Sequence, residues 1–210
     1  MDKKKQVARF IEIFELAHAR YGRNTYRLAG EGWEHHWQTL VATIMSAQTR
    51  DETTIPVAEN LFKKYPTLSS LSKADVHEVL AIIKRVNYSP TKARHIVATA
   101  NELLQKFNGE VPKTIDELIT LPGVGRKTAN LIVAECYGDD SICVDTHVHR
   151  IANLMGIVKT KTPHDTEMAL RELVPKKYWS KINRLFVLWG KEAPGHDAEY
   201  LLGVLNGKIK

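Results

Sequence analysis

The chain has 210 residues, of which 43% are hydrophobic, so it can form one large domain or two small ones, and this composition argues against disorder. The formal net charge is +6, which favours an anionic partner, either nucleic acid or an anionic membrane surface. Because the apolar stretches are shorter than the ~18 residues of a membrane span, and MDKKKQVARF lacks the apolar core of a signal peptide, we expect nucleic acid as the partner, no membrane, and a cytoplasmic location.

Apolar residues recur with helical spacing along almost the whole chain, and short turn clusters separate the segments. The expected helices, in chain order, cover about 3–21, 34–46, 51–65, 72 or 75 onward, 89–107, 114–121, 126–137, 145–155, 162 onward, 178–190, and a short tail at 197–205. Their expected N-caps are Asp51, Ser72 with Asp75, Ser89 before Pro90, Thr114 with Glu117, Asp145, and Thr162 before Pro163. The sequence shows no long linker or internal repeat, so the expected fold class is all-α.

The segment LPGVGRKT, residues 121–128, has the pattern of a tight turn between two helices. Pro122 ends the preceding helix, and Gly123 and Gly125 can adopt positive φ and let a ligand approach the backbone closely. The helix that begins near Arg126 presents N–H groups and the positive end of its dipole, which suits a DNA phosphate. The alternative is a simple turn between two packed helices, but the basic pair directly after the turn favours an anion site.

Lys127 stands at the start of that helix, and Asp145 follows eighteen positions later within VDTHVHR. A lysine that is partly buried there, close to other cations, is expected to have a lowered pKa, and its neutral amine is the nucleophile that Schiff-base chemistry needs. The alternative role for Lys127 is one more phosphate contact. Asp145 is expected to cap the next helix, and its ionised carboxylate can also stabilise positive charge that develops on a sugar ring.

The region from LPGVGRKTANLIVAECYG to VDTHVHRIANLMG resembles the helix-hairpin-helix and catalytic region of the endonuclease III family of DNA glycosylases. The spacing from Lys127 to Asp145 is the spacing that this family uses. IMSAQTRD, residues 44–51, resembles the family segment that reaches into the DNA stack, and KFNGEVPKTIDELITLPGVG extends the match upstream. The resemblance covers roughly residues 33–190, which is most of the chain.

The resemblance implies an all-α, two-domain helix-hairpin-helix DNA glycosylase fold with the active-site cleft between the domains. A six-helix barrel domain that includes the hairpin would span residues 28–139, and residues 1–27 plus 140–210 would form the second helical domain. The expected protein is a monomer that binds double-stranded DNA containing damaged bases or abasic sites. Its expected setting is the prokaryotic-type cytoplasm, in association with the nucleoid.

The implied activity is that of a base-excision repair DNA glycosylase with apurinic/apyrimidinic (AP) lyase activity on oxidised pyrimidines, which the family flips out of the duplex. By analogy, Lys127 would attack the sugar C1′, Asp145 would stabilise the oxocarbenium-like charge, and the Schiff base would lead to strand cleavage by β-elimination. Two alternatives stay open. One is a mismatch-specific uracil or thymine glycosylase, against which Lys127 weighs, because related mismatch enzymes usually lack this lysine. The other is a non-catalytic helix-hairpin-helix module that contacts only the DNA backbone.

Further residues receive roles from the resemblance. Gln48 resembles the residue that fills the gap left by the flipped nucleotide, and Tyr88 stands about where the family often has a leucine wedge. The Tyr88 ring could stack between bases or simply pack under the proline at position 90. Ser46, Asp51 and His147 resemble residues near the pocket and the DNA, and their alternative roles are a helix end, a cap and a packed histidine.

Most members of the family hold a four-iron cluster on four cysteines after the last long helix. This chain has two cysteines, Cys136 and Cys143, and Pro194 stands about where the first cluster cysteine would be. We therefore expect no iron–sulfur cluster and closure of the C-terminal segment by apolar residues such as Leu201 and Val204. The histidines lack the spacing of a transition-metal site, so none is expected, while the hairpin carbonyls could hold a monovalent cation.

Overall fold

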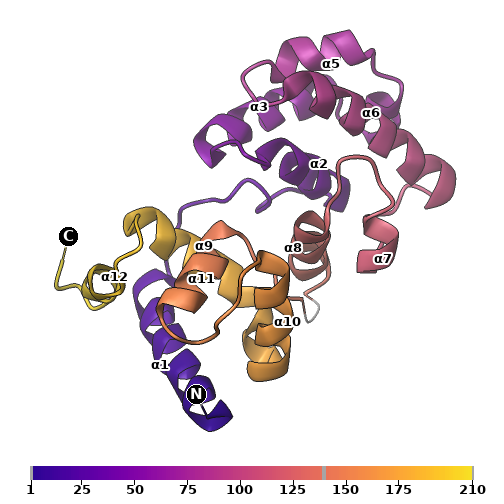
Figure 1. The fold of residues 1–210 in the computed structure, drawn as a ribbon. Helices are drawn as coiled ribbons and strands as arrows, with labels where there is room; N and C mark the ends of the chain where they lie inside the picture. The colour runs from indigo at the N-terminus through magenta and orange to yellow at the C-terminus, as the bar shows by residue number, and fades with distance from the viewer. Residues whose placement is uncertain (1, 139–140, 210) are drawn as a thin grey trace. The chain divides into compact units, whose positions relative to one another are not determined.

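The computed structural model describes residues 2–138 and 141–209, and the regular secondary structure in these ranges is entirely helical (Figure 1). Contacts within the chain divide it into two compact units. We call Arg27–Gly138 the central unit, and Met1–Tyr26 together with Asp139–Lys210 the terminal unit. The all-α class that the apolar spacing predicts is confirmed.

The central unit is built around one buried helix, α2. Its helices are α2 (His36–Ser46), α3 (Asp51–Lys64), α4 (Leu68–Ser72), α5 (Val76–Ile83), α6 (Ser89–Lys106), α7 (Ile115–Leu118) and α8 (Arg126–Tyr137). Helix α2 packs against α3, α6 and α8, and its residues Leu40, Val41 and Met45 have no exposed surface. Residues 40–45 of this helix, LVATIM, are all buried, because α2 has neighbouring helices on all its sides.

The terminal unit joins the first helix of the chain to the last ones. Its helices are α1 (Lys3–Tyr21), α9 (Thr146–Leu154), α10 (Pro163–Leu173), the 3-10 helix η1 (Lys176–Tyr178), α11 (Trp179–Glu192) and α12 (Ala198–Leu205). Helix α11 packs against α1, α9 and α12, and Phe10 and Ile13 of α1 share one core with Phe186 and Trp189 of α11. In Figure 1 the indigo α1 and the yellow α12 accordingly lie in the same unit.

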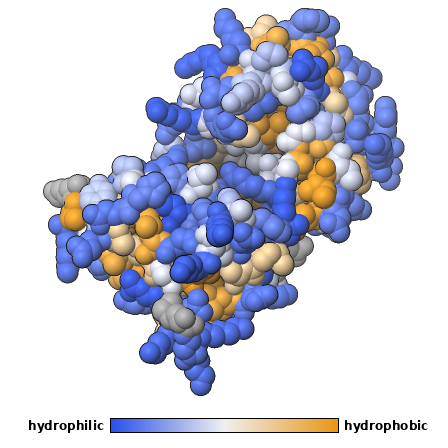
Figure 2. Space-filling model, viewed as in Figure 1, coloured by the Kyte–Doolittle hydropathy of each residue, from blue (hydrophilic) through white to orange (hydrophobic). Residues whose placement is uncertain are grey.

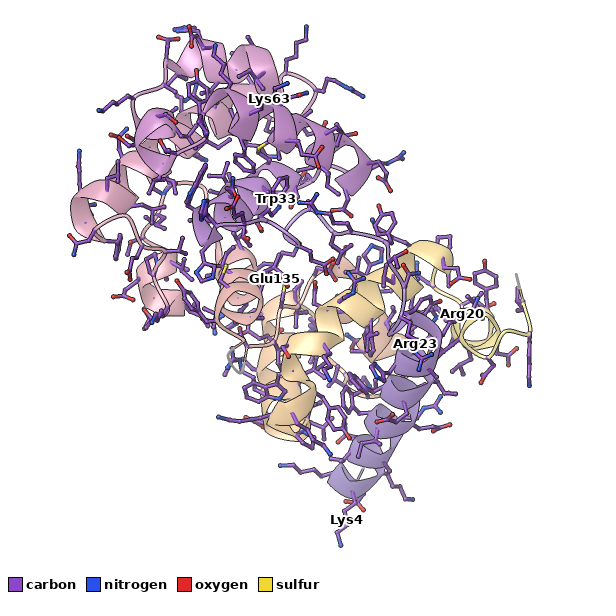
Figure 3. The ribbon with its side chains drawn as sticks, turned by 180° about the vertical axis from the view of Figure 1, so that it is seen from behind. Lys4, Arg20, Arg23, Trp33, Lys63 and Glu135 are labelled. Carbon is purple, nitrogen blue, oxygen red and sulfur yellow. The ribbon has the colours of Figure 1, made fainter. Side chains whose placement is uncertain are left out.

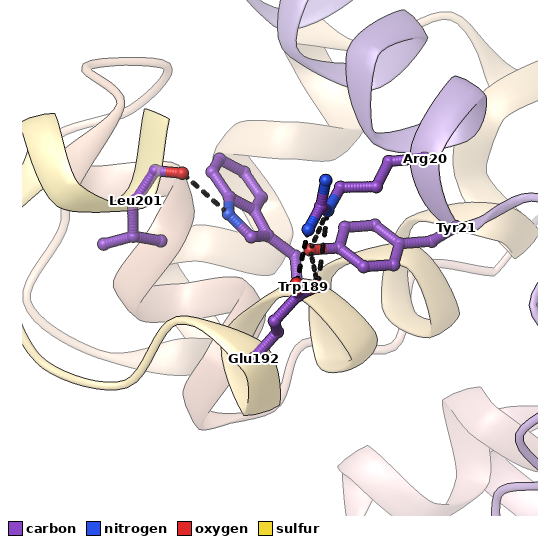
Figure 4. A network of polar contacts seen from close by, with 5 residues as sticks. All are labelled: Arg20, Tyr21, Trp189, Glu192 and Leu201. Atoms are coloured by element: carbon purple, nitrogen blue, oxygen red, sulfur yellow. Dashed lines mark hydrogen bonds and ion pairs between the residues drawn. The ribbon is translucent and has the colours of Figure 1, made fainter. Parts of the chain in front are cut away.

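The C-terminal helix α12 is attached by a buried leucine and a tryptophan. Leu201 is fully buried, and its carbonyl accepts a hydrogen bond from Trp189 Nε1 at 3.0 Å (Figure 4). At the end of α11, Glu192 forms an ion pair with Arg20 and accepts a hydrogen bond from Tyr21 Oη at 2.6 Å. The hydrogen bond from Arg20 lowers the pKa of the Glu192 carboxyl. Helices α1, α11 and α12 are therefore held together by side-chain contacts.

Most helices lie where the pattern predicts them, but three expected N-caps are wrong. Ser72 ends α4, which the pattern does not reveal because this helix has only five residues, and Asp75 alone caps α5. Asp51 and Ser89 are each the first residue of a helix, one position inside the expected cap. The N-cap of α6 is Tyr88, in the left-handed region at φ 58°.

The face of the molecule seen in Figure 2 is mainly polar. Figure 2 shows hydrophilic side chains over most of the visible face, with smaller apolar patches between them. Among the large apolar side chains, Tyr88 stands out with 64% of its surface exposed. The helices in the described ranges are all too short or too polar to cross a membrane.

Candidate functional site

The segment LPGVG forms the connection between α7 and α8, and it is anchored from the inside. Leu121 and Val124 are buried in the core of the central unit, and Val124 N donates a hydrogen bond to Leu121 O at 3.1 Å. Gly123 and Gly125, which flank Val124, are exposed. The hairpin therefore turns its apolar side chains inward and its glycine backbone outward.

Helix α6 supports the hairpin from one side. Gly123 has φ +78°, and a Cβ added there would lie 2.8 Å from His95 Nδ1. Four residues further along α6, Thr99 Oγ1 donates a hydrogen bond to Pro122 O at 2.8 Å. The sequence reading did not single out His95 and Thr99, although their spacing of four places them on one helix face.

Gly125 does not use the positive φ that is open to a glycine. It is the N-cap of α8, with φ −93° and ψ 173°, an extended conformation that any residue can adopt. A Cβ added at Gly125 would meet no atom within 4 Å. Its backbone therefore borders open space at the positive end of the α8 dipole, the arrangement that suits an approaching anion.

Arg126 and Lys127 are the first two residues of α8, and both side chains are exposed. The expectation that Lys127 is partly buried is therefore wrong. A residue in the first turn of α8 is buried only on the helix face that packs inward, and this face carries Thr128 and Ala129 instead. The Lys127 side chain therefore projects from the exposed side of the first turn of α8.

Asp145 is the N-cap of α9 in the terminal unit, as the sequence predicts. Its Oδ1 accepts a hydrogen bond from Val148 N at 2.9 Å, and its side chain is half-buried. His147, in the same first turn, packs over α11: a Cβ added at Gly190 would lie 2.3 Å from His147 Nδ1. The local geometry of His147 is thus that of the packed histidine, which was the alternative to a DNA contact.

Gln48 and Tyr88 are brought together from two separate loops. Both are exposed and both have left-handed backbone conformations, at φ 55° and φ 58°. Asn87, next to Tyr88, donates a side-chain hydrogen bond to Gln48 O, and its N–H donates to Thr49 Oγ1 at 3.1 Å. With 64% of its surface exposed, Tyr88 does not fit the alternative of a ring packed under Pro90.

Lys92 is a residue that the sequence reading did not single out. Its side chain is 6% exposed, and its Nζ donates hydrogen bonds to Met45 O at 2.7 Å and to Ala47 O at 2.5 Å. Burial lowers the pKa of Lys92 to about 8. No local signal points to this residue, because its partners lie more than forty positions earlier in the chain.

The two pocket candidates of the central unit have local structural contacts. Ser46 ends α2, and its Oγ donates to Thr43 O at 2.9 Å. Asp51 begins α3, and its Oδ1 accepts a hydrogen bond from Ala29 N at 3.0 Å. These contacts fix both ends of the loop that carries Gln48.

The available side chains do not match a four-thiolate iron–sulfur cluster, since the chain has only two cysteines. Burial raises the pKa of the Cys136 thiol to about 12, which disfavours the thiolate that a metal needs. Within the described ranges, no three His, Cys, Asp or Glu side chains lie close enough together to hold a metal ion. At the hairpin, Leu121 O and Pro122 O each already accept one hydrogen bond.

Comparisons with known proteins agree with one another. Residues 41–176 match the family of HhH-GPD superfamily base excision DNA repair proteins. The chain is 41% identical to endonuclease III of Thermotoga maritima over 155 residues, which cover 74% of this chain and 73% of the relative. It is 37% identical to endonuclease III of Synechocystis over 155 residues, 73% of this chain and 71% of the relative.

Two solved structures of endonuclease III also resemble the chain. A trapped covalent intermediate of endonuclease III with DNA has a TM-score of 0.83 at 29% identity, covering 93% of this chain and 89% of the other. A non-covalent endonuclease III–DNA complex has a TM-score of 0.83 at 27% identity, covering 99% and 98%. The chain therefore belongs to the HhH-GPD superfamily of base-excision DNA repair proteins and is a two-domain DNA glycosylase of the endonuclease III type.

Proposed function

We propose that the protein removes oxidised pyrimidines from double-stranded DNA and then cleaves the strand as an AP lyase, through a Schiff base on Lys127. The observation that carries this proposal is the exposed position of Lys127 at the start of α8, directly after the glycine hairpin. A phosphate held at the hairpin brings a neighbouring sugar towards this amine. The likeness to endonuclease III–DNA structures supports DNA as the partner.

The proposed chemistry needs one amine and one carboxylate. The neutral Nζ of Lys127 attacks C1′ of the flipped nucleotide, and the bond from C1′ to the base breaks, so that the base leaves with the bonding electrons and takes up a proton. The Asp145 carboxylate stabilises positive charge on the sugar while this bond breaks. The added amine loses its proton, the C1′–O4′ bond breaks while O4′ takes up a proton, and the Schiff base between Nζ and C1′ forms. Removal of a C2′ proton then expels the 3′ phosphate by β-elimination.

In this proposal, residues of the central unit open the base stack and hold the backbone. The Gln48 amide fills the gap left by the flipped nucleotide, and the exposed Tyr88 ring stacks on the neighbouring bases. Arg126 adds a charged contact to the phosphate at the hairpin. Ser46 and Asp51 shape the loop that carries Gln48.

Borohydride trapping tests the role of Lys127. The parent protein mixed with an abasic-site duplex and borohydride is expected to give a covalent protein–DNA adduct, and Lys127→Gln is expected to give none. Lys63→Gln is the matched control, because Lys63 is an exposed lysine on α3 of the same unit (Figure 3). If Lys127→Gln traps as well as the parent, the assignment is wrong. Peptide mapping of the adduct then shows whether another amine, such as that of Lys92, reacts.

A panel of lesions in one duplex context tests the substrate. We expect release of oxidised pyrimidines with strand cleavage and weaker action on uracil or mismatched thymine opposite guanine. Release of uracil or thymine without strand cleavage would instead support a mismatch-specific glycosylase. DNA binding without base release or cleavage of any lesion would support a module that only binds the backbone.

A further inference from the structure

The loop after α2 and the loop before α6 each contain an exposed residue with strained backbone. Gln48 and Tyr88 both adopt left-handed conformations, although neither is glycine. Such conformations persist only where the surrounding contacts enforce them. The contacts that enforce them here therefore also fix the backbone positions from which the two side chains project.

Lys92 supplies the central contact between these loops. Its Nζ donates to Met45 O and Ala47 O, which are the last carbonyls around the C-terminal end of α2, and lies 3.3 Å from Thr49 Oγ1. These three acceptors match the three protons of an ammonium group. A cation at this end of α2 also interacts favourably with the helix dipole. Lys92 thus fixes the course of the chain on both sides of Gln48.

The same lysine is one helical turn away from Tyr88. The backbone N–H of Lys92 donates a hydrogen bond to Tyr88 O at 3.0 Å, in the first turn of α6. Asn87 adds a second connection, because its side chain donates to Gln48 O while its N–H donates to Thr49 Oγ1. The segment from Asn87 to Lys92 and the segment from Met45 to Thr49 therefore form one hydrogen-bonded assembly.

We propose that Lys92 is a positioning residue for base excision, which holds Gln48 and Tyr88 at a fixed separation so that both enter the DNA stack together. This inference rests on the proposed function of these two side chains. Lys92 itself touches neither the lesion nor the reacting atoms. Its lowered pKa reflects the cost of burying the amine, a cost that an apolar side chain of the same length would avoid. The hydrogen bonds to the loop are what the amine adds over such a side chain.

The test combines Lys92→Met, which keeps the length of the side chain, with Asn87→Ala, which removes one connection at an exposed position. Lys63→Met is the control for loss of a lysine in the same unit. We expect Lys92→Met to lower base excision from duplex DNA about 100-fold, as for a misplaced catalytic geometry. Asn87→Ala is expected to give a smaller loss and the control none. Urea unfolding establishes that each variant is folded.

A double-variant comparison separates positioning from general stability. If Lys92 acts through Gln48, adding Gln48→Ala to Lys92→Met lowers excision little further, whereas independent losses multiply. In the DNA-free protein, ¹⁵N relaxation of residues 46–50 and 86–89 is expected to show added mobility in Lys92→Met. If the excision losses of Lys92→Met and Gln48→Ala multiply in an active protein, the inference about Lys92 is wrong. The same holds if residues 46–50 and 86–89 of Lys92→Met are as rigid as in the parent. Either result leaves the proposed function standing. A parent protein that excises no damaged base would overturn the proposed function and this inference with it.

Discussion

The two hairpin glycines are needed for different physical reasons. Gly123 has a positive φ and lies against His95 of α6, so both its conformation and its contacts exclude a side chain. Gly125 has an extended backbone and open space where a Cβ would project. The fold therefore requires glycine at 123, and any requirement at 125 comes from a ligand.

Alanine at each position separates folding from binding. Gly123→Ala is expected to lower the free energy of unfolding by about 1–3 kcal/mol, because it combines a strained backbone with a contact to His95. Gly125→Ala is expected to cost less than about 1 kcal/mol but to weaken binding to an abasic-site duplex, since its methyl group occupies the path of the phosphate. Urea unfolding and fluorescence anisotropy at one fixed salt concentration measure the two effects. DNA affinity unchanged in Gly125→Ala would mean that no phosphate approaches the backbone there.

Site residues whose contacts are local in sequence could be predicted from the sequence, whereas those whose environment depends on distant parts of the chain could not. Asp145 was predictable because its hydrogen bond to Val148 N is local. The exposure of Lys127 was not, because burial in the first turn of α8 depends on which face packs on the rest of the central unit. The role of Lys92 could not be predicted for the same reason, because its hydrogen-bond acceptors lie far away in sequence, at the C-terminal end of α2.

At the scale of elements, long helices with clear ends are the predictable part of the fold. Helices α1 and α8 have the bounds that the pattern predicts, and α8 ends at Gly138 in the left-handed conformation expected of a C-terminal glycine. Helix α4 and the 3-10 helix η1 were missed because they are too short for a helical repeat to show. At α6, the pattern of serine before proline pointed to Ser89, but the cap is Tyr88, which contacts in the loops hold in place.

Helix α12 completes the terminal unit. Substitutions at its two adjacent leucines test how much its packing contributes to the stability of the unit. Leu201 is fully buried and Leu202 only half-buried. We expect Leu201→Ala to lower the free energy of unfolding by about 3 kcal/mol and Leu202→Ala by about 1 kcal/mol, because a cavity forms only at the buried position. Equal, small effects of the two variants in urea unfolding would show that α12 contributes little to the stability of the unit.

At the scale of the whole molecule, the cysteine content predicts a protein without an iron–sulfur cluster. The two cysteines fall in different units, Cys136 in the central unit and Cys143 in the terminal unit. We expect purified protein to lack the cluster absorption near ~400 nm and to keep its activity when iron is chelated. An absorption band there that follows the iron content of the preparation would contradict this prediction. The hairpin spacing predicted the family, while the cysteine count marks where this chain departs from it.

The order of the helices along the chain has a consequence for synthesis on the ribosome. Helix α1 ends at Tyr21, but its packing partner α11 begins only at Trp179. At roughly 5–20 residues per second, on the order of ten seconds pass before this partner is made. Throughout that time the apolar stripe of α1, with Phe10 and Phe14, lacks the part of its core that α11 contributes. The whole of the central unit is therefore synthesised before α11, the helix against which α1 packs, is made.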